Sequence, residues 1–234
     1  MASSYSDKVI ISVGGSLIVP SGGIDTKFLS NLNKFIRSQL SKNKKRQFFL
    51  VAGGGRITRH YQTAAQKVIR HELTHEDLDW LGIYATRLNA QLIKSIFNKN
   101  AENFIVENPN SKINFNKNII IACGWKPGWS TDYDAVLVAK NLGVKEVLNM
   151  SSVDYVYDKD PKKHKNARKI EKITWQDYSK LISNKWKAGM NVPFDPVAAK
   201  EAEKSKLRVC LIGRDLKNLE NLLNGDKFRG TTIR

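Results

Sequence analysis

The stretch LVAGGGRITR, residues 50–59, joins an apolar run to three consecutive glycines and two arginines. The run at 48–52 is typical of a strand covered on both faces, and the glycines at 53–55 end it. Glycine lets backbone N–H groups come close to an anion, and the start of a following helix adds positive potential. Arg56 and Arg59 add cations, and the planar fork of Arg59 fits a phosphate. The stretch predicts an anion site at a strand end.

The same arrangement occurs at two other predicted strand ends. A β-branched run at 9–13 ends in GGS at 14–16, and the run at 119–122 leads into CGWKPGWSTDYDA, residues 123–135. Hydroxyls in this third loop could donate to a phosphate or could cap the next helix. None of the loops has the spacing of a Walker A or GxGxxG motif. We therefore expect several loops to form one anion site together.

Strand and helix patterns alternate along nearly the whole chain. Strands are predicted at 9–13, 48–52, 104–106, 119–122, 146–150 and 207–212. Helices are predicted at 28–40, 64–69, 78–97, 135–142, 175–182, 197–202 and 216–223. The alternation predicts an α/β fold with an open, mainly parallel sheet covered on both faces, and ligands beyond the carboxyl ends of the strands.

Composition narrows the class of protein. The 234 residues are 41% hydrophobic, enough for a packed core, and no apolar stretch approaches the roughly 20 residues of a membrane helix. The first residues lack signal-peptide features, and Cys123 and Cys210 have no metal-binding spacing, so we expect buried thiols in a cytoplasmic protein. The net charge of +17 fits either a solvated lysine-rich surface or attraction of phosphorylated small molecules; no motif supports nucleic-acid binding.

A set of further motifs accompanies the glycine loops. They are DWLGIYATRLNAQLI at 79–93, PGWSTD at 127–132, VDYVYDKDPKK at 153–163, DPVAAKEAEKS at 195–205 and GTTI at 230–233. In this order and spacing the chain resembles the amino acid kinase superfamily, most closely the archaeal-type uridylate (UMP) kinases. The resemblance runs nearly from end to end.

The resemblance implies a fold and an activity. The fold would be a single domain over 1–234, a three-layer α/β/α sandwich with an open, mainly parallel eight-stranded sheet. An acceptor-binding half, about 1–145, would meet an ATP-binding half, about 146–234. The activity would be phosphoryl transfer from ATP to UMP, giving UDP, with Mg²⁺. The partners would be small-molecule nucleotides and further copies of the chain, assembled as hexamers through amino-terminal helices.

The resemblance also implies roles for individual residues. ATP phosphates would meet Gly15, Ser16, Gly55 and Arg59, and the adenosine part would meet Ser151, Ser152, Tyr157 and Asp160. UMP would meet Gly54, Asp79, Gly124, Trp125, Lys126, Pro127, Gly128, Trp129, Ser130 and Thr131. The transfer site would contain Gly15, Arg59 and Asp195, and no metal ligand is assigned.

Two departures from the family pattern support other functions. Trp125, Lys126 and Trp129 stand where the family carries small residues or histidine, which favours a related kinase for another small phosphate or acid. Ser152 and Tyr155 replace an asparagine and a glycine, which favours a nucleotide-binding, anion-binding or storage protein without catalysis. If the position of Tyr155 requires a positive φ, a tyrosine there would be strained.

Overall fold

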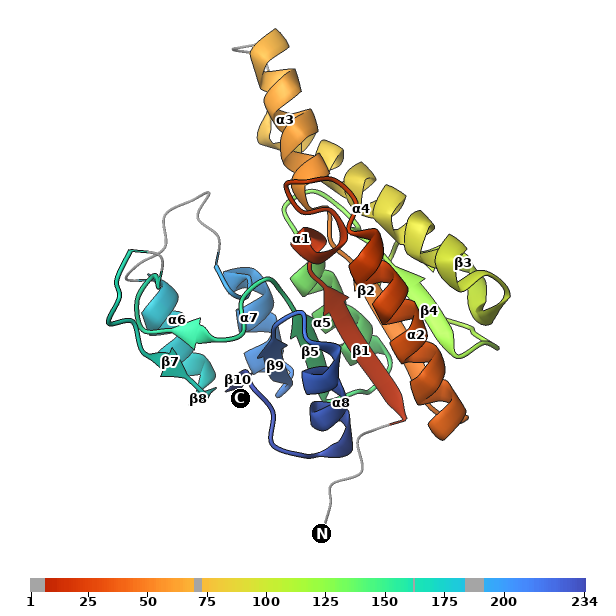
Figure 1. Ribbon diagram of the computed structural model, residues 1–234. Coiled ribbons are helices and arrows are strands. Elements are labelled where there is room, and N and C mark those ends of the chain that lie inside the picture. The colour runs from red at the N-terminus through yellow and green to blue at the C-terminus, as the bar shows by residue number, and fades with distance from the viewer. Residues whose placement is uncertain (1–6, 70–72, 162, 184–191) are drawn as a thin grey trace.

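The computed structural model describes residues 7–69, 73–161, 163–183 and 192–234. Residues 1–6, which bear on the signal-peptide expectation, lie outside this part of the chain, as does Lys162 of the 153–163 motif. One sheet has the strand order β3-β4-β2-β1-β5-β9-β10-β8 (Figure 1). Its strands are β1 (Lys8–Val13), β2 (Gln47–Ala52), β3 (Ala101–Val106), β4 (Ile119–Ala122), β5 (Glu146–Met150), β8 (Lys172–Ile173), β9 (Arg208–Ile212) and β10 (Thr231–Ile233).

The parallel strands end together at one edge of the sheet. Val13 lies opposite both Ala52 and Met150, Val51 lies opposite Ala122, and Met150 lies opposite Ile212. We call this the carboxyl edge. The glycine loops predicted to form an anion site all leave the sheet there, because parallel strands present their carboxyl ends on the same side.

Helices cover both faces of the sheet and make the three layers that the resemblance implied (Figure 1). One face packs against α2 (Thr26–Lys42), α4 (His75–Phe97) and α8 (Leu216–Asn224). The other packs against α5 (Thr131–Asn141), α6 (Trp175–Ser183) and α7 (Pro196–Lys204). The central strands are buried on both faces, which explains their continuous apolar runs.

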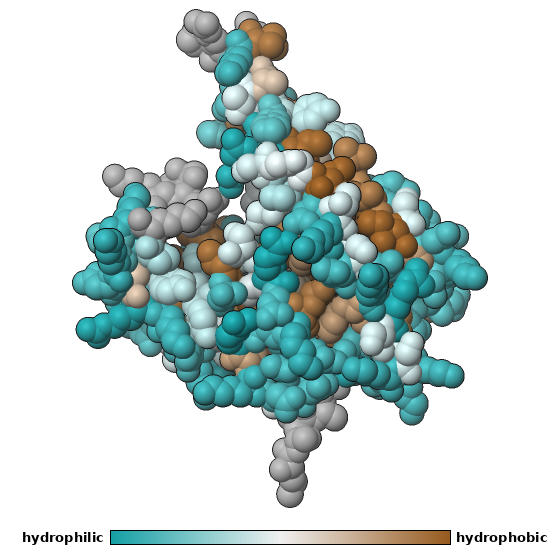
Figure 2. Space-filling view, viewed as in Figure 1, coloured by the Kyte–Doolittle hydropathy of each residue, from teal (hydrophilic) through white to brown (hydrophobic). Residues whose placement is uncertain are grey.

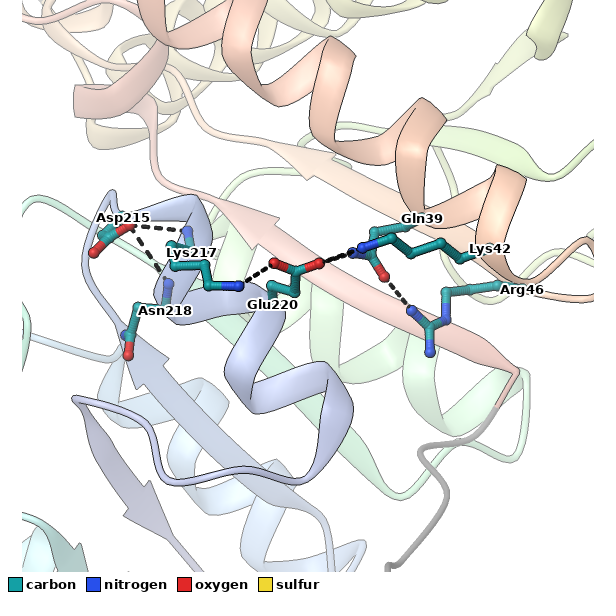
Figure 3. Close-up of polar contacts among 7 residues, drawn as sticks. All are labelled: Gln39, Lys42, Arg46, Asp215, Lys217, Asn218 and Glu220. Carbon is teal, nitrogen blue, oxygen red and sulfur yellow. Dashed lines mark hydrogen bonds and ion pairs between the residues drawn. The ribbon is translucent and has the colours of Figure 1, made fainter.

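The carboxylate of Glu220 joins α2 to α8 within the helix layer formed by α2, α4 and α8 (Figure 3). One oxygen of Glu220 accepts from Lys42 Nζ at 2.6 Å and Gln39 Nε2 at 3.2 Å, and the other accepts from Lys217 Nζ at 2.8 Å. Arg46 extends the network by donating to Gln39 Oε1. The two lysines lower the pKa of Glu220 to about 2, because they stabilise its charged form.

Several short elements were not predicted from the sequence. They are α1 (Gly15–Ile18), η1 (Asn98–Asn100), β6 (Val156–Tyr157), β7 (Lys169–Ile170), β8 and β10, and β10 runs antiparallel to β9. Elements of two to four residues are too short to display a hydrophobic period. Four predicted elements begin three or more residues earlier than expected: β3 at Ala101, α4 at His75, α5 at Thr131, and α3 (Arg56–Val68) directly after the third glycine.

Helix α3 projects beyond the sheet beside the start of α4 (Figure 1). It has no buried residue. Tyr61 and Val68 on α3 are 57% and 81% exposed, and Tyr84 and Leu88 on α4 are each 60% exposed. Figure 2 shows hydrophobic residues at the tip of this projection and along its flank. Within the described ranges, no helix is both long and apolar enough to cross a membrane.

Candidate active site at the carboxyl edge

The first two glycine loops pack backbone against backbone. A Cβ added to Gly15 would lie 2.0 Å from the nitrogen of Gly55, and one added to Gly53 would lie 2.4 Å from the nitrogen of Gly15. Gly55 also has φ 72, a conformation that side chains rarely adopt. The glycines are therefore required by the contact between the loops, as well as by any ligand that approaches them.

Helix α4 fixes two of the loops through buried polar side chains. Asn89 Nδ2 donates to the carbonyl oxygens of Gly53 at 2.8 Å and Gly54 at 2.9 Å. Thr86 Oγ1 accepts from the backbone N–H of Gly124 at 2.8 Å. Because both side chains are buried, these bonds hold the second and third loops in a set geometry.

Asp79 belongs to the same face of α4. Its Oδ2 accepts from the backbone N–H of Gly128 at 2.7 Å, so it also holds the third loop. Asp79, Gly82, Thr86 and Asn89 are separated by three, four and three residues, the spacing of one helix face. Of these four residues, only Asp79 was predicted from the sequence. The helical spacing of small and polar residues was the signal that could have found the others.

The second and third loops, α3 and α4 enclose a cavity of about 500 Å³, and no residue of the first loop lines it. Nine of the predicted site residues line it, namely Gly54, Gly55, Arg59, Asp79, Gly124, Gly128, Trp129, Ser130 and Thr131. Thr58, Gln62, Gly82, Ile83 and Thr86 line it as well and were not predicted. Trp125, Lys126 and Pro127 belong to the third loop but do not line the cavity, so the structure separates them from the other predicted acceptor residues.

The unusual side chains of the third loop form a cluster of their own. Lys126 Nζ lies 4.5 Å from the ring centroid of Trp125 and 4.3 Å from that of Trp129. The two indole rings meet edge to face at 4.9 Å, and Trp129 also packs on Tyr133 at 4.4 Å. Cation–π contacts contribute about 0.5–2 kcal/mol each. The cluster therefore holds Trp129 in place as a wall of the cavity.

Two carboxylates meet where β1, β5 and α7 approach the third loop. Asp132 Oδ1 accepts from Ser12 Oγ at 3.0 Å and from Asn149 Nδ2 at 2.9 Å, and Asp132 Oδ2 accepts from the backbone N–H of Asp195 at 3.3 Å. Asp195 caps α7 by accepting from the N–H of Ala198 at 2.7 Å. Burial raises the pKa of Asp132 to about 6 and raises that of Asp195 as well.

These carboxylates suit a magnesium ion that is shared with substrate phosphates. Among the described residues, no group of three or more His, Cys, Asp or Glu side chains is placed to hold a metal. Mg²⁺ usually takes one or two carboxylates and completes its shell with water and phosphate oxygens. Asp132 and Asp195 form no ion pair with Lys or Arg in the part of the chain that the structure describes, so their charge is uncompensated there.

A third carboxylate lies beneath the loop. Asp134 is 0% exposed, and its Oδ2 accepts from the backbone N–H of Trp125 at 3.3 Å. Its Oδ1 has no hydrogen-bond partner. Burial raises the pKa of Asp134 to about 7, because a charge is costly away from water. Asp134 was not predicted from the sequence, since a lone aspartate in a helix gives no signal of burial.

The residues predicted to hold adenosine lie outside the 500 Å³ cavity, after β5. Ser151 Oγ accepts from the N–H of Val153 at 3.1 Å and so shapes the loop. The ring of Tyr155 meets that of Tyr157 at 6.3 Å and lies under Lys169 Nζ at 4.9 Å. Tyr155 does not have a positive φ, so the strain considered from the sequence does not occur.

Comparison with known proteins identifies the class. The model of the amino acid kinase family matches residues 7–213, and the chain belongs to this family. A uridylate kinase of Thermoplasma acidophilum is 31% identical over 97% of this chain and 96% of its own length. A uridylate kinase of Thermococcus sibiricus is 32% identical over 97% of this chain and 99% of its own length.

Solved structures agree with the fold. The crystal structure of uridylate kinase from Archaeoglobus fulgidus superposes with a TM-score of 0.78 at 28% identity, covering 97% of this chain and 100% of that one. The UMP kinase of Bacillus anthracis superposes with a TM-score of 0.77 at 18% identity, covering 98% of this chain and 96% of that one, which shows the shared fold alone.

Proposed function

We propose that the protein is an ATP-dependent UMP kinase that forms UDP. The uridylate kinases named above support this activity, since they match the chain nearly from end to end. The observation that carries the proposal is the cavity at the carboxyl edge where the second glycine loop, Arg59 and the third loop converge. A cavity lined by glycine-rich loops and an arginine suits a phosphate acceptor with an attached base and sugar.

For phosphoryl transfer, the protein must align the two substrates and compensate the negative charge on the phosphate oxygens. The acceptor would lie in the half of the chain up to about residue 145, and ATP would lie over the half from about 146. Gly15, Ser16, Gly55 and Arg59 would contact the phosphates along the line of transfer. The contact between Gly15 and Gly55 supports this arrangement, because it places the first and second loops side by side.

The carboxylates give a place for a cation. Mg²⁺, when bound, would draw negative charge from the transferring phosphate oxygens. Asp132 and Asp195 would hold it together with the phosphates, and Ser12 and Asn149 would keep Asp132 in position by hydrogen bonding. Ser151, Ser152, Tyr157 and Asp160 would hold the adenosine part of ATP, as the family resemblance implies.

A coupled assay of ADP formation tests the proposal directly. The purified protein would receive ATP, Mg²⁺ and, in turn, UMP, CMP, dTMP, isopentenyl phosphate, acetylglutamate or carbamate. We expect turnover mainly with UMP. Turnover with a different acceptor, or none with any acceptor while nucleotides still bind to the folded protein, would contradict the proposal.

One observation favours a second candidate, a kinase for another small phosphate or acid. Trp129 lines the cavity, and the Lys126 cluster fixes its ring, so the third loop presents a bulky wall. Such a wall would exclude some acceptors and stack on others. The same panel of acceptors separates this candidate from a UMP kinase.

We further infer that the protein works as a homo-oligomer in the cytoplasm, a hexamer by family resemblance. Exposed apolar side chains on α3 and α4, such as Val68 and Leu88, support burial against another copy. Cys123 and Cys210 are free and buried, as is usual in a reducing compartment. Light scattering coupled to size-exclusion chromatography tests the assembly, and a monomeric mass would contradict it.

A further inference from the structure

A larger cavity lies at the opposite edge of the sheet, where β1, β5 and β9 begin. It measures about 690 Å³ and shares no lining residue with the cavity at the carboxyl edge. We call it the amino-edge cavity. Its wall is apolar and includes Val9, Val144, Trp175 and Leu207, all of which are buried. A cavity of this volume is in the range that takes a nucleotide-sized molecule.

The rim of the amino-edge cavity is positively charged. Five cationic and two acidic side chains line it. One acid, Glu146, is already engaged by Arg208. In the part of the chain that the structure describes, the side chains of Lys145, Lys206 and Arg234 form no hydrogen bond or ion pair with the protein, and all three are exposed. These three cationic side chains are therefore available to bind an anion.

Lys206 occupies a backbone position that normally favours glycine. It follows the last residue of α7 and its cap, and its φ is 53. The N–H of Lys206 bonds the carbonyl of Glu203 at 3.0 Å, and the N–H of Leu207 bonds that of Ala202 at 2.9 Å, which closes the helix end. Glycine is the common residue at such a site. A lysine at this position is strained by its positive φ, and it adds a cation to the rim.

We propose that the amino-edge cavity binds a phosphorylated ligand of nucleotide size. Its phosphates lie against Lys145, Lys206 and Arg234, and its apolar or aromatic body lies against Trp175 and Leu207. Strand β1, six residues long, separates this cavity from the glycine loops by about 20 Å. A ligand there cannot take part in phosphoryl transfer, so it would act as an effector.

Fluorine NMR on protein labelled with 5-fluorotryptophan tests the proposal. Trp175 reports on the amino-edge cavity and Trp129 on the carboxyl edge, and Trp→Phe variants assign the two signals. The probes are inorganic pyrophosphate and ATP. We expect each to shift the Trp175 signal saturably, with ATP acting at lower concentration because it also has an aromatic body. A Trp175 signal that stays fixed while that of Trp129 moves would overturn the proposal.

Two double variants show whether the rim is responsible. Lys145→Gln with Lys206→Gly removes two rim cations, and the glycine suits the backbone at 206. Lys99→Gln with Lys112→Gln makes the same charge change at exposed positions away from both cavities. We expect at least a tenfold weaker Trp175 response in the first variant alone. Equal titrations in both variants would contradict phosphate binding by the rim cations. Pyrophosphate binding as tightly as ATP would contradict a contact between the apolar wall and the body of the ligand.

The two proposals fail separately. If the protein is not a UMP kinase, turnover with UMP is absent, while the Trp175 signal still responds to pyrophosphate. If the amino-edge cavity binds no phosphate, turnover and the Trp129 response remain.

Discussion

The carboxyl edge and the contact between α2 and α8 both hold carboxylates, but in opposite electrostatic settings. At the carboxyl edge, burial raises the pKa values of Asp132 and Asp134 to about 6 and about 7. Between α2 and α8, two lysines lower the pKa of Glu220 to about 2. The side chains have the same chemistry, and only the neighbouring charges and the access of water differ.

The difference separates carboxylates whose charge is compensated from carboxylates whose charge is not. The negative charge of Glu220 is compensated by ion pairs with Lys42 and Lys217, so it requires no cation from outside the chain. Asp132 and Asp195 are held by hydrogen bonds without a cation among the described residues, so that part of the chain does not neutralise their negative charge. Groups whose pKa values are perturbed inside a cleft are frequent at active sites.

The largest expected effect comes from the packing of the two glycine loops at the carboxyl edge. Gly15→Ala places a methyl group 2.0 Å from the nitrogen of Gly55, and backbone there cannot yield easily. We expect a loss of roughly 2–4 kcal/mol in the free energy of unfolding, together with loss of turnover. Urea unfolding and the ADP assay measure the two effects. Gly22→Ala, where nothing lies within 4 Å, is the control and should change neither.

Asp132→Asn should separate catalysis from stability. The variant keeps a side chain of the same shape but removes the charge that would hold a cation, so we expect turnover to fall about 100-fold or more. Asp215→Asn, at the cap of α8, is the matched change away from the cavity and should leave turnover unchanged. Equal turnover in the two variants would show that the charge of Asp132 is not used.

Asp134→Asn should change how stability depends on pH. Burial raises the pKa of Asp134 from its ordinary value of 3.8 to about 7 in the folded protein. The contribution of Asp134 to wild-type stability should therefore be greatest below about pH 4, should fall by on the order of 2–4 kcal/mol between about pH 4 and pH 7, and should level off above pH 7. The variant lacks this fall, so its free energy of unfolding relative to wild type should rise between about pH 4 and pH 7. A constant difference in urea unfolding across that range would contradict the pKa.

The smallest effect is expected at Glu220, with the opposite sign. Its lowered pKa means that its ion pairs stabilise the protein above about pH 4.5, and that this contribution is lost as pH falls towards 2. Glu220→Gln should cost less than about 1 kcal/mol at neutral pH, because the lysines are largely exposed. Molar salt should reduce the difference further, and an unchanged cost would argue against an electrostatic origin.

The sequence alone determined the fold class and the edge at which the site lies. Apolar runs that end in glycine, at Val13 and Ala52, fixed where the strands stop and which loops leave them. Local patterns suffice for this, because strand periodicity and glycine's conformational freedom belong to short segments. The order of the motifs was sufficient to indicate the family.

Only the tertiary structure decided how the site is held together. The contact of Gly15 with Gly55, the bonds from Asn89 to the second loop, and the burial of Asp134 join segments that are far apart in the chain. The amino-edge cavity likewise forms from the starts of three strands, the start of α6 and the end of α7. Distances, solvent access and pKa values depend on which segments meet, and no local pattern encodes that.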